Sequence, residues 1–162
     1  MEGVASGVRI RRAHPEEAEL LTELIMRSKA FWGYDATLLA AWRSDLTLES
    51  KVVARDPVYC AEDRYTGFIM GVSHFYRLDD DELYLDHLFV EPACMGKGVG
   101  ARLWSHAVAQ AAAQGLRAVV LGADPNARPF YERMGAVVVG WEESPIVPGR
   151  RTPVMRYDLP PC

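Results

Sequence analysis

Hydrophobic and polar residues alternate along several short segments of the chain, which is the pattern of strands with one buried face. At the start, Val8 and Ile10 alternate with arginines. The expected strands are residues 8–11, 52–61, 67–77, 83–90, 117–123 and 136–141, with a last one around Met155, Tyr157 and Leu159. Asp56 and Pro57 interrupt the second of these, which is therefore either two strand pieces or a strand and its lead-in.

Other segments repeat their apolar residues at the spacing of a helix that packs on one side. Pro15 suits the first position of the first helix, and Asp35 or Thr37 could cap the second. Gly115 is a natural stop for the third. The expected helices begin near Pro15, Thr37, Val99 and Asn126.

The order of these elements predicts an α+β fold. A strand and two helices are followed by a meander of strands, after which helix and strand alternate. We expect a single domain over residues 1–162, with its core at about 7–160, built on a mixed, mostly antiparallel twisted sheet flanked by about four helices. The acidic run at residues 79–82 fits a solvated turn between two paired strands.

The composition excludes disorder and several kinds of partner. The chain is 49% hydrophobic and 25% charged, a balance typical of proteins that bury a core. Its formal net charge of −4 argues against nucleic acid as a partner. The alanine-rich stretch at residues 107–113 is far shorter than the roughly 20 residues that cross a bilayer, so no membrane partner is expected.

Cellular location and metal content follow from two further features. The opening residues lack the apolar run of a signal peptide, which favours a cytoplasmic location. The cysteines Cys60, Cys94 and Cys162 are odd in number, are scattered, and include no CxxC pair. We expect free thiols in a reducing compartment, without a disulfide framework or a metal site.

A glycine-rich loop joins the end of a predicted strand to the start of a predicted helix. Gly96, Gly98 and Gly100 lie within five residues. Glycine lacks the Cβ that would block a ligand, and a helix start offers backbone N–H groups and a positive dipole end. The combination suits phosphate or pyrophosphate, to which Lys97 could add a charge; a tight turn without a ligand is the alternative. The spacing fits neither a Walker loop nor a dinucleotide fingerprint.

With residues 90–92 before this loop and the motif at residues 123–135 after it, the chain resembles the GNAT superfamily of acetyl-CoA-dependent N-acetyltransferases. The resemblance covers nearly the whole chain, and it implies a GNAT-like fold and acetyl-CoA as the cosubstrate. It assigns Leu88, Phe89 and Val90 to the pantetheine arm, and Met95, Gly96, Lys97, Gly98, Val99, Gly100 and Ala101 to the pyrophosphate. Met95 stands where the family usually has Arg or Gln, so phosphate binding is left mainly to backbone N–H groups.

The resemblance also implies Tyr131 as the acid that protonates the departing thiolate. A phenol, with a reference pKa of about 10, stays protonated at neutral pH. The alternative is a packed tyrosine beside Phe130. For Asn126 we expect the N-cap of the last helix, because Pro129 then falls at the third helical position; the family implies a contact with the pantetheine arm or a water.

The general base is sought on the strand at residues 83–90. Strand alternation places Asp86 on one face and His87 on the other. In the family this strand supplies an acid or a proton path, so Asp86 is the first candidate and His87 the second, with packing as the alternative for His87. His74 is a weaker candidate, and His106 is expected to be solvated.

Acceptor recognition is assigned to the linker after the first helix, because the family forms part of its acceptor cleft there. Trp32 and Tyr34 could stack on a substrate, and Asp35 could pair with its ammonium group. The alternative is that these aromatics close the core while Asp35 caps a helix.

Together these features predict an acetyl-CoA-dependent N-acetyltransferase. It would acetylate a primary amine of a small molecule or peptide by direct transfer in a ternary complex, since Cys94 lies beside the phosphate loop, far from the acetyl group. A non-catalytic acyl-CoA-binding or regulatory module on the same fold is the alternative. Exposed strands and a long C-terminal hairpin permit a homodimer. Fold alone does not choose the acceptor.

Overall fold

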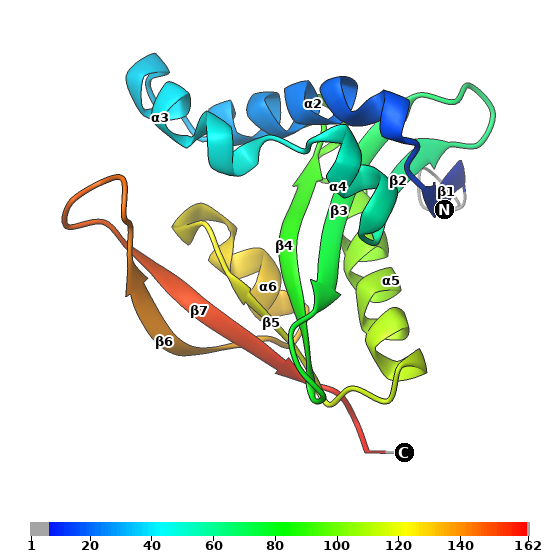
Figure 1. Ribbon diagram of the computed structural model, residues 1–162, viewed down its shortest axis with the longest axis vertical. Helices are drawn as coiled ribbons and strands as arrows, with labels where there is room; N and C mark the ends of the chain where they lie inside the picture. The colour runs from blue at the N-terminus through cyan, green and yellow to red at the C-terminus, as the bar shows by residue number, and fades with distance from the viewer. Residues whose placement is uncertain (1–6, 162) are drawn as a thin grey trace. The chain divides into compact units, whose positions relative to one another are not determined.

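The computed structural model describes residues 7–161 of the protein (Figure 1). Contacts between residues group the chain into two compact units. The first unit comprises the residues up to Phe75 together with His87–His106, and the second comprises Tyr76–Asp86 together with the residues from Ala107 onward. One domain over residues 1–162 stays a prediction.

The first unit contains strands and helices from the first two thirds of the chain. Its elements are β1 (Val8–Arg12), the 3-10 turn η1 (Pro15–Glu17), α2 (Ala18–Ala30), α3 (Ala36–Leu46), α4 (Ser50–Arg55), β2 (Val58–Asp63), most of β3 (Ile69–Arg77), the end of β4 (Glu82–Val90), the 3-10 turn η2 (Pro92–Cys94) and the start of α5 (Val99–Ala113). The strand order is β1-β2-β3-β4, and β2 is antiparallel to both β1 and β3.

Two apolar clusters cover the two faces of these strands. The first, here the α2-side cluster, joins apolar residues of α2 and α4 to Val58, Cys60 and Val72, with Phe89 packed against it. The second, here the α5-side cluster, joins Val99 and Leu103 of α5 to apolar residues of β1, β2 and β3, with Leu88 and Val90 packed against it. Successive residues of β4 therefore face opposite clusters, as the sequence predicts.

The second unit completes the α+β architecture. Its elements are the start of β4, β5 (Ala118–Gly122), the 3-10 turn η3 (Pro125–Ala127), α6 (Arg128–Arg133), β6 (Val137–Glu143) and β7 (Arg151–Asp158). The strand order is β4-β5-β7-β6; β4 and β5 are parallel, and the other two pairs are antiparallel. The predicted fold class, α+β with a mixed, mostly antiparallel set of strands, is confirmed.

The strand predicted over residues 52–61 is wrong in its first half. Residues 50–55 form α4, in which Val53 is buried in the α2-side cluster, and β2 begins only at Val58. A proline disfavours helical backbone at the residue before it, so the helix ends at Arg55 and the backbone of Asp56 is extended. Residues 7–161 consequently contain five α-helices rather than about four.

The remaining boundaries lie close to those expected. The acidic turn is confirmed: Asp79 accepts hydrogen bonds from the backbone N–H groups of Asp81 and Glu82, both at 2.8 Å. Within residues 7–161, no helix is both long and apolar enough to cross a membrane.

Candidate active site

The glycine loop (residues 95–101) lies in the first unit between β4 and α5. Gly96 and Gly98 have φ values of 78° and 84°, a region that side chains with a Cβ rarely enter. A Cβ at either position would meet no atom within 4 Å. Backbone conformation, rather than crowding, therefore requires glycine here, and the space beside both residues is open.

A bidentate ion pair fixes the residue that leads into the glycine loop. Arg27 of α2 donates from Nε and Nη2 to the two carboxylate oxygens of Glu91, at 2.9 and 2.8 Å. The backbone of Glu91 is held as well, because its N–H donates to the carbonyl of Met70 at 2.9 Å and its carbonyl accepts from Cys94 at 2.8 Å. Side chain and backbone together set where the glycine loop begins.

The glycine loop fits a phosphate-bearing ligand by its backbone. Gly96, Lys97 and Gly98 are exposed, and α5 starts immediately after them. The first N–H groups of a helix have no acceptor within that helix, and its N-terminus carries a partial positive charge. Met95 is half-buried, so the charge of Lys97 is the one that the loop itself presents to solvent.

The cysteines of the described chain are poorly suited to nucleophilic attack. Cys60 and Cys94 are free and buried. Burial raises the pKa of the Cys94 thiol, and it raises the pKa of Cys60 to about 12. Both side chains are therefore protonated at neutral pH. Cys162 lies outside the described residues.

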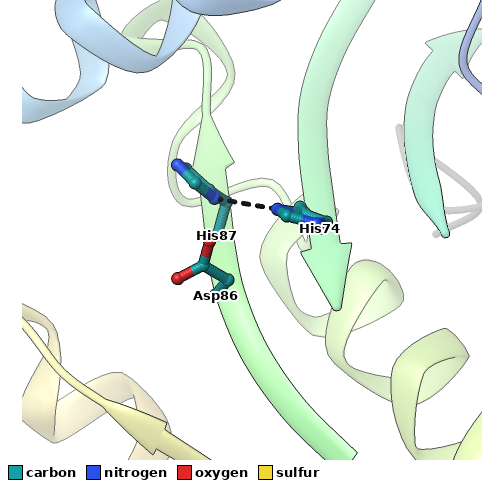
Figure 2. A group of neighbouring side chains, drawn as sticks. All are labelled: His74, Asp86 and His87. Carbon is teal, nitrogen blue, oxygen red and sulfur yellow. Dashed lines mark hydrogen bonds between the residues drawn. The ribbon is translucent and has the colours of Figure 1, made fainter. Parts of the chain in front are cut away.

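A buried hydrogen-bonded series, here the histidine chain (Asp56, His74 and His87), crosses the first unit. His74 on β3 and His87 on β4 are each 5% exposed. Their Nδ1 atoms are 3.3 Å apart, and Figure 2 shows this contact as a dashed line. The Nε2 of His74 lies 2.8 Å from Oδ2 of Asp56, at the end of α4. Three polar side chains thus follow one another through an otherwise apolar face.

Asp56 ends the histidine chain as a charged carboxylate. Arg55 donates from Nε to Oδ1 of Asp56 at 2.7 Å. This hydrogen bond, supported by the one to His74, lowers the pKa of Asp56. The Asp56 side chain is 17% exposed and the Arg55 side chain 68%, so the histidine chain runs from a buried ring to the surface.

The other candidate residues of β3, β4 and α5 are placed differently. Asp86 precedes His87 on β4 (Figure 2), and it is exposed to solvent. Imidazole nitrogens such as the two Nδ1 atoms of the histidine chain can also bind transition metals, and the absence of a metal stays a prediction.

The expectation that His106 is solvated is wrong. Its Nδ1 is buried and its ring centroid lies 4.3 Å from that of Tyr59, because α5 packs this face on β2.

The linker between α2 and α3 has an exposed and a packed part. Trp32 is 42% exposed, so it does not close the core. Tyr34 packs edge-on against Trp42, with ring centroids 4.8 Å apart. Asp35 is the N-cap of α3 and accepts a hydrogen bond from the N–H of Leu38 at 2.8 Å, which confirms capping.

Tyr131 lies in the second unit on α6. It is 6% exposed, and its ring packs edge-on against that of Phe130, with centroids 5.0 Å apart. Burial, with a smaller contribution from the negative charge of Asp124, raises the pKa of Tyr131. The phenol is therefore protonated throughout the neutral range, as a proton donor must be.

Asn126 is not the N-cap of a helix, which corrects the prediction. The 3-10 turn η3 precedes α6, and Asp124 caps it by accepting from the N–H of Asn126 at 2.8 Å. Because the turn occupies residues 125–127, Pro129 falls in the first turn of α6, where a missing N–H is tolerated. Asn126 itself is exposed.

The predicted site residues are therefore divided between the two units. The first unit holds the glycine loop, residues 88–90 and the linker residues Trp32, Tyr34 and Asp35, while the second holds Asp86, Asn126 and Tyr131. Sequence reasoning did not single out Asp56. The pairing of β3 with β4 and the end of α4 bring it into the histidine chain, and no short motif signals such an arrangement.

Known proteins resemble this chain over most of its length. A family model described as an acetyltransferase (GNAT) domain matches residues 29–146. The peptidyl-lysine N-acetyltransferase YjaB of Salmonella typhimurium is 32% identical over 143 residues, which span 84% of this chain and 88% of the relative.

Solved structures share the fold at lower identity. The PaiA N-acetyltransferase of Thermoplasma acidophilum, in complex with coenzyme A, superposes with a TM-score of 0.78 at 17% identity, covering 94% of this chain and 99% of that one. YncA of Salmonella typhimurium, a putative acetyltransferase with its cofactor acetyl-CoA, gives a TM-score of 0.66 at 21% identity, covering 96% and 95% of the two chains.

Proposed function

Because the chain belongs to the GNAT acetyltransferase family, we propose that it is an acetyl-CoA-dependent N-acetyltransferase acting on a primary amine by direct transfer in a ternary complex. The observation that carries the proposal is the family match over residues 29–146, which include the glycine loop and Tyr131. In the reaction, the amine nitrogen bonds to the acetyl carbon and the carbon–sulfur bond breaks. The amine must lose a proton, and the thiolate must gain one.

Acetyl-CoA is the proposed cosubstrate. The glycine loop would hold its pyrophosphate through backbone N–H groups, with Lys97 adding charge, and Leu88, Phe89 and Val90 would line the pantetheine arm. Coenzyme A in the PaiA structure and acetyl-CoA in the YncA structure support this choice, since both proteins share the fold. Asn126, which is exposed, would contact the arm directly or through water.

Tyr131 is the proposed acid. Its buried phenol, with the pKa raised, keeps its proton until negative charge develops on the sulfur. Asp86 is the candidate base that the sequence ranks first, and its exposure leaves it accessible to an amine. The buried thiols of Cys60 and Cys94, both with raised pKa values, favour direct transfer over an acetyl-cysteine intermediate.

The proposed acceptor is a primary amine, and a lysine side chain is the first to test. The relative at 32% identity is a peptidyl-lysine N-acetyltransferase. Trp32 is exposed enough to stack on a substrate. Tyr34 would contribute with it, and the carboxylate of Asp35 could attract an ammonium group while still capping α3. A cytoplasmic location and a homodimer stay predictions.

The test is an acetyl-CoA consumption assay over a panel of amines, which includes lysine peptides, free amino acids and small polyamines. Thermal unfolding is measured in parallel with and without coenzyme A. We expect thiol release with at least one amine, and a higher Tm with coenzyme A because a ligand stabilises the state that it binds. A Tm shift without turnover would favour the non-catalytic acyl-CoA-binding module. The absence of both turnover and a Tm shift would refute the proposal.

A further inference from the structure

We propose that His87 is the base that takes the proton from the acceptor amine, and that His74 and Asp56 act through it as a proton relay. The inference rests on the proposed acetyl transfer, and it assigns the role of the base to His87 in place of Asp86. The observation that carries it is the unbroken series from Asp56 through His74 to His87, with contacts of 2.8 and 3.3 Å.

The proposed relay requires one particular tautomer of each ring. The Asp56 carboxylate can only accept, so the Nε2 of His74 carries a hydrogen. In the relay, a neutral His74 has its lone pair on Nδ1 and accepts from Nδ1–H of His87. The lone pair of His87 is then on Nε2. Figure 2 shows this second nitrogen on the side of the ring turned away from His74.

This arrangement allows a proton taken up by His87 to displace another one toward Asp56. When the ammonium group of an acceptor gives its proton to Nε2 of His87, the proton on Nδ1 of His87 moves to Nδ1 of His74. The products are a neutral amine, a neutral His87 and an imidazolium at His74 beside the Asp56 carboxylate. The positive charge thus comes to rest against a negative one. The reverse transfer delivers the proton to water after the acetylated product has left.

A base is needed because an alkyl amine such as a lysine side chain, with a reference pKa of about 10.4, is mostly protonated at neutral pH. Imidazole exchanges protons readily in this range. In contrast to the exposed Asp86, the His87 ring is buried and held in one orientation by His74. A fixed base needs no reorganisation at the moment of reaction.

The histidine chain lies on the face of β3 and β4 that the α2-side cluster covers. His87 alternates with Phe89 on β4, and His74 alternates with Val72 on β3. Val72 is a member of the α2-side cluster, and Phe89 packs against it. The linker with Trp32 continues from α2. The proposed base therefore faces the cluster to which α2 contributes, and the proposed acceptor residues of the first unit follow α2 in the chain.

The first test measures the tautomers without any turnover. Long-range proton–nitrogen correlation NMR of the full-length protein would report the ring nitrogens of its four histidines, assigned with single His→Gln variants. We expect neutral His74 with hydrogen on Nε2 and neutral His87 with hydrogen on Nδ1. A His87 with hydrogen on Nε2, whether neutral or doubly protonated, would overturn the relay because its outer nitrogen would have no lone pair.

The second test separates a relay from a structural role by kinetics with acetyl-CoA and the best amine of the assay panel. His87→Gln should lower kcat about 100-fold or more, with little change in KM for acetyl-CoA. His74→Asn keeps an oxygen that can accept from His87 but cannot take up its proton, so it should lower kcat about tenfold. Asp56→Asn should act like His74→Asn. His14→Gln, at an exposed histidine, is the matched control.

A His74→Asn variant with the parental kcat would overturn the relay. Loss of activity in Asp86→Asn, with activity retained in His87→Gln, would also overturn the relay. Loss of parental activity on addition of a chelator would overturn it as well, because it would indicate a metal at the Nδ1 atoms. If the variants fail to fold, as judged by Tm, the tautomers still test the relay. A parent that acetylates no amine refutes the proposed function itself, whereas an active parent with unaffected variants refutes the relay alone.

Discussion

The glycine loop and the histidine chain prepare the first unit for its proposed chemistry in opposite ways. The glycine loop is exposed and offers mainly backbone groups, with two residues at positive φ. The histidine chain is mostly buried and consists of side chains from β3, β4 and the C-cap of α4. A backbone site tolerates changes of side chain and is sensitive to changes of conformation, whereas a side-chain site behaves in the reverse manner.

Replacing the proposed acid should produce the largest effect and should leave the glycine loop unaffected. Tyr131→Phe removes one hydroxyl from a buried ring, so we expect kcat to fall about 100-fold or more while the Kd for acetyl-CoA stays the same. Steady-state kinetics and calorimetric titration check the two quantities. Tyr65→Phe, at a tyrosine that is 83% exposed, is the control. Equal activity in both variants would remove Tyr131 from the reaction.

The ion pairs of β1 and β2 should separate stability from function. Arg11 and Arg9 both pair with the buried carboxylate of Glu62 and lower its pKa. Because the folded-state pKa lies below the unfolded one, the stabilisation is present above about pH 4.3 and is lost as pH falls through the folded pKa. Glu62→Gln should therefore cost about 2 kcal/mol of unfolding free energy at pH 7.

Denaturant unfolding at several pH values checks this prediction. The difference in unfolding free energy between parent and Glu62→Gln should shrink as the pH falls below about 4, where Glu62 is protonated first in the unfolded state and, at lower pH, in the folded state. A difference independent of pH would mean that packing, rather than charge, is lost. At saturating substrates, kcat should be unchanged, since Glu62 belongs to neither the glycine loop nor the histidine chain.

A conformational change in the glycine loop should weaken binding without slowing chemistry. Gly98 has a φ of 84° with open space around it, so Gly98→Val introduces backbone strain rather than a clash. We expect the Kd for coenzyme A to rise about tenfold, with kcat retained at saturation. Gly140→Ala, at an ordinary φ and with equally open space, is the control. A parental Kd in Gly98→Val would show that the backbone does not hold the phosphates.

A side-chain change in the same loop should have the smallest effect. Met95→Arg introduces the residue type that the family often has, yet we expect the Kd for coenzyme A to change by less than about threefold, because the proposed binding mode relies on backbone N–H groups. Titration at low and moderate salt measures it, since an added charge acts more strongly at low salt. A tenfold gain would assign the binding to side chains.

The difference between the two regions also explains what the sequence could predict. The glycine loop is contiguous, so the conformation of Gly96 and Gly98 and the start of α5 at Val99 follow from the local sequence. Strand alternation on β4 was equally readable, and it correctly placed Leu88 and Phe89 on opposite faces. These features depend on neighbours within a few residues.

The histidine chain could not be predicted in that way. Asp56 and His74 are 18 residues apart in the sequence. They meet because Asp56, which directly follows α4, lies beside β3 in the folded chain. Val52 and Val53 suit a strand as well as the buried face of a helix. The sequence therefore did not predict α4, nor the position of Asp56 at its end. Asn126 lies within the 3-10 turn η3, which precedes the helix, and Asp124 rather than Asn126 is the N-cap of that turn.

The most direct test of direct acetyl transfer is a single-turnover experiment followed by mass spectrometry. The protein is mixed with a stoichiometric amount of acetyl-CoA, and the best amine of the assay panel is then added. We predict no acetyl group on the protein before the amine is added, and one acetyl group on the amine afterwards. An acetylated protein before addition, or acetyl-CoA left intact after it, would contradict direct N-acetyl transfer by this chain.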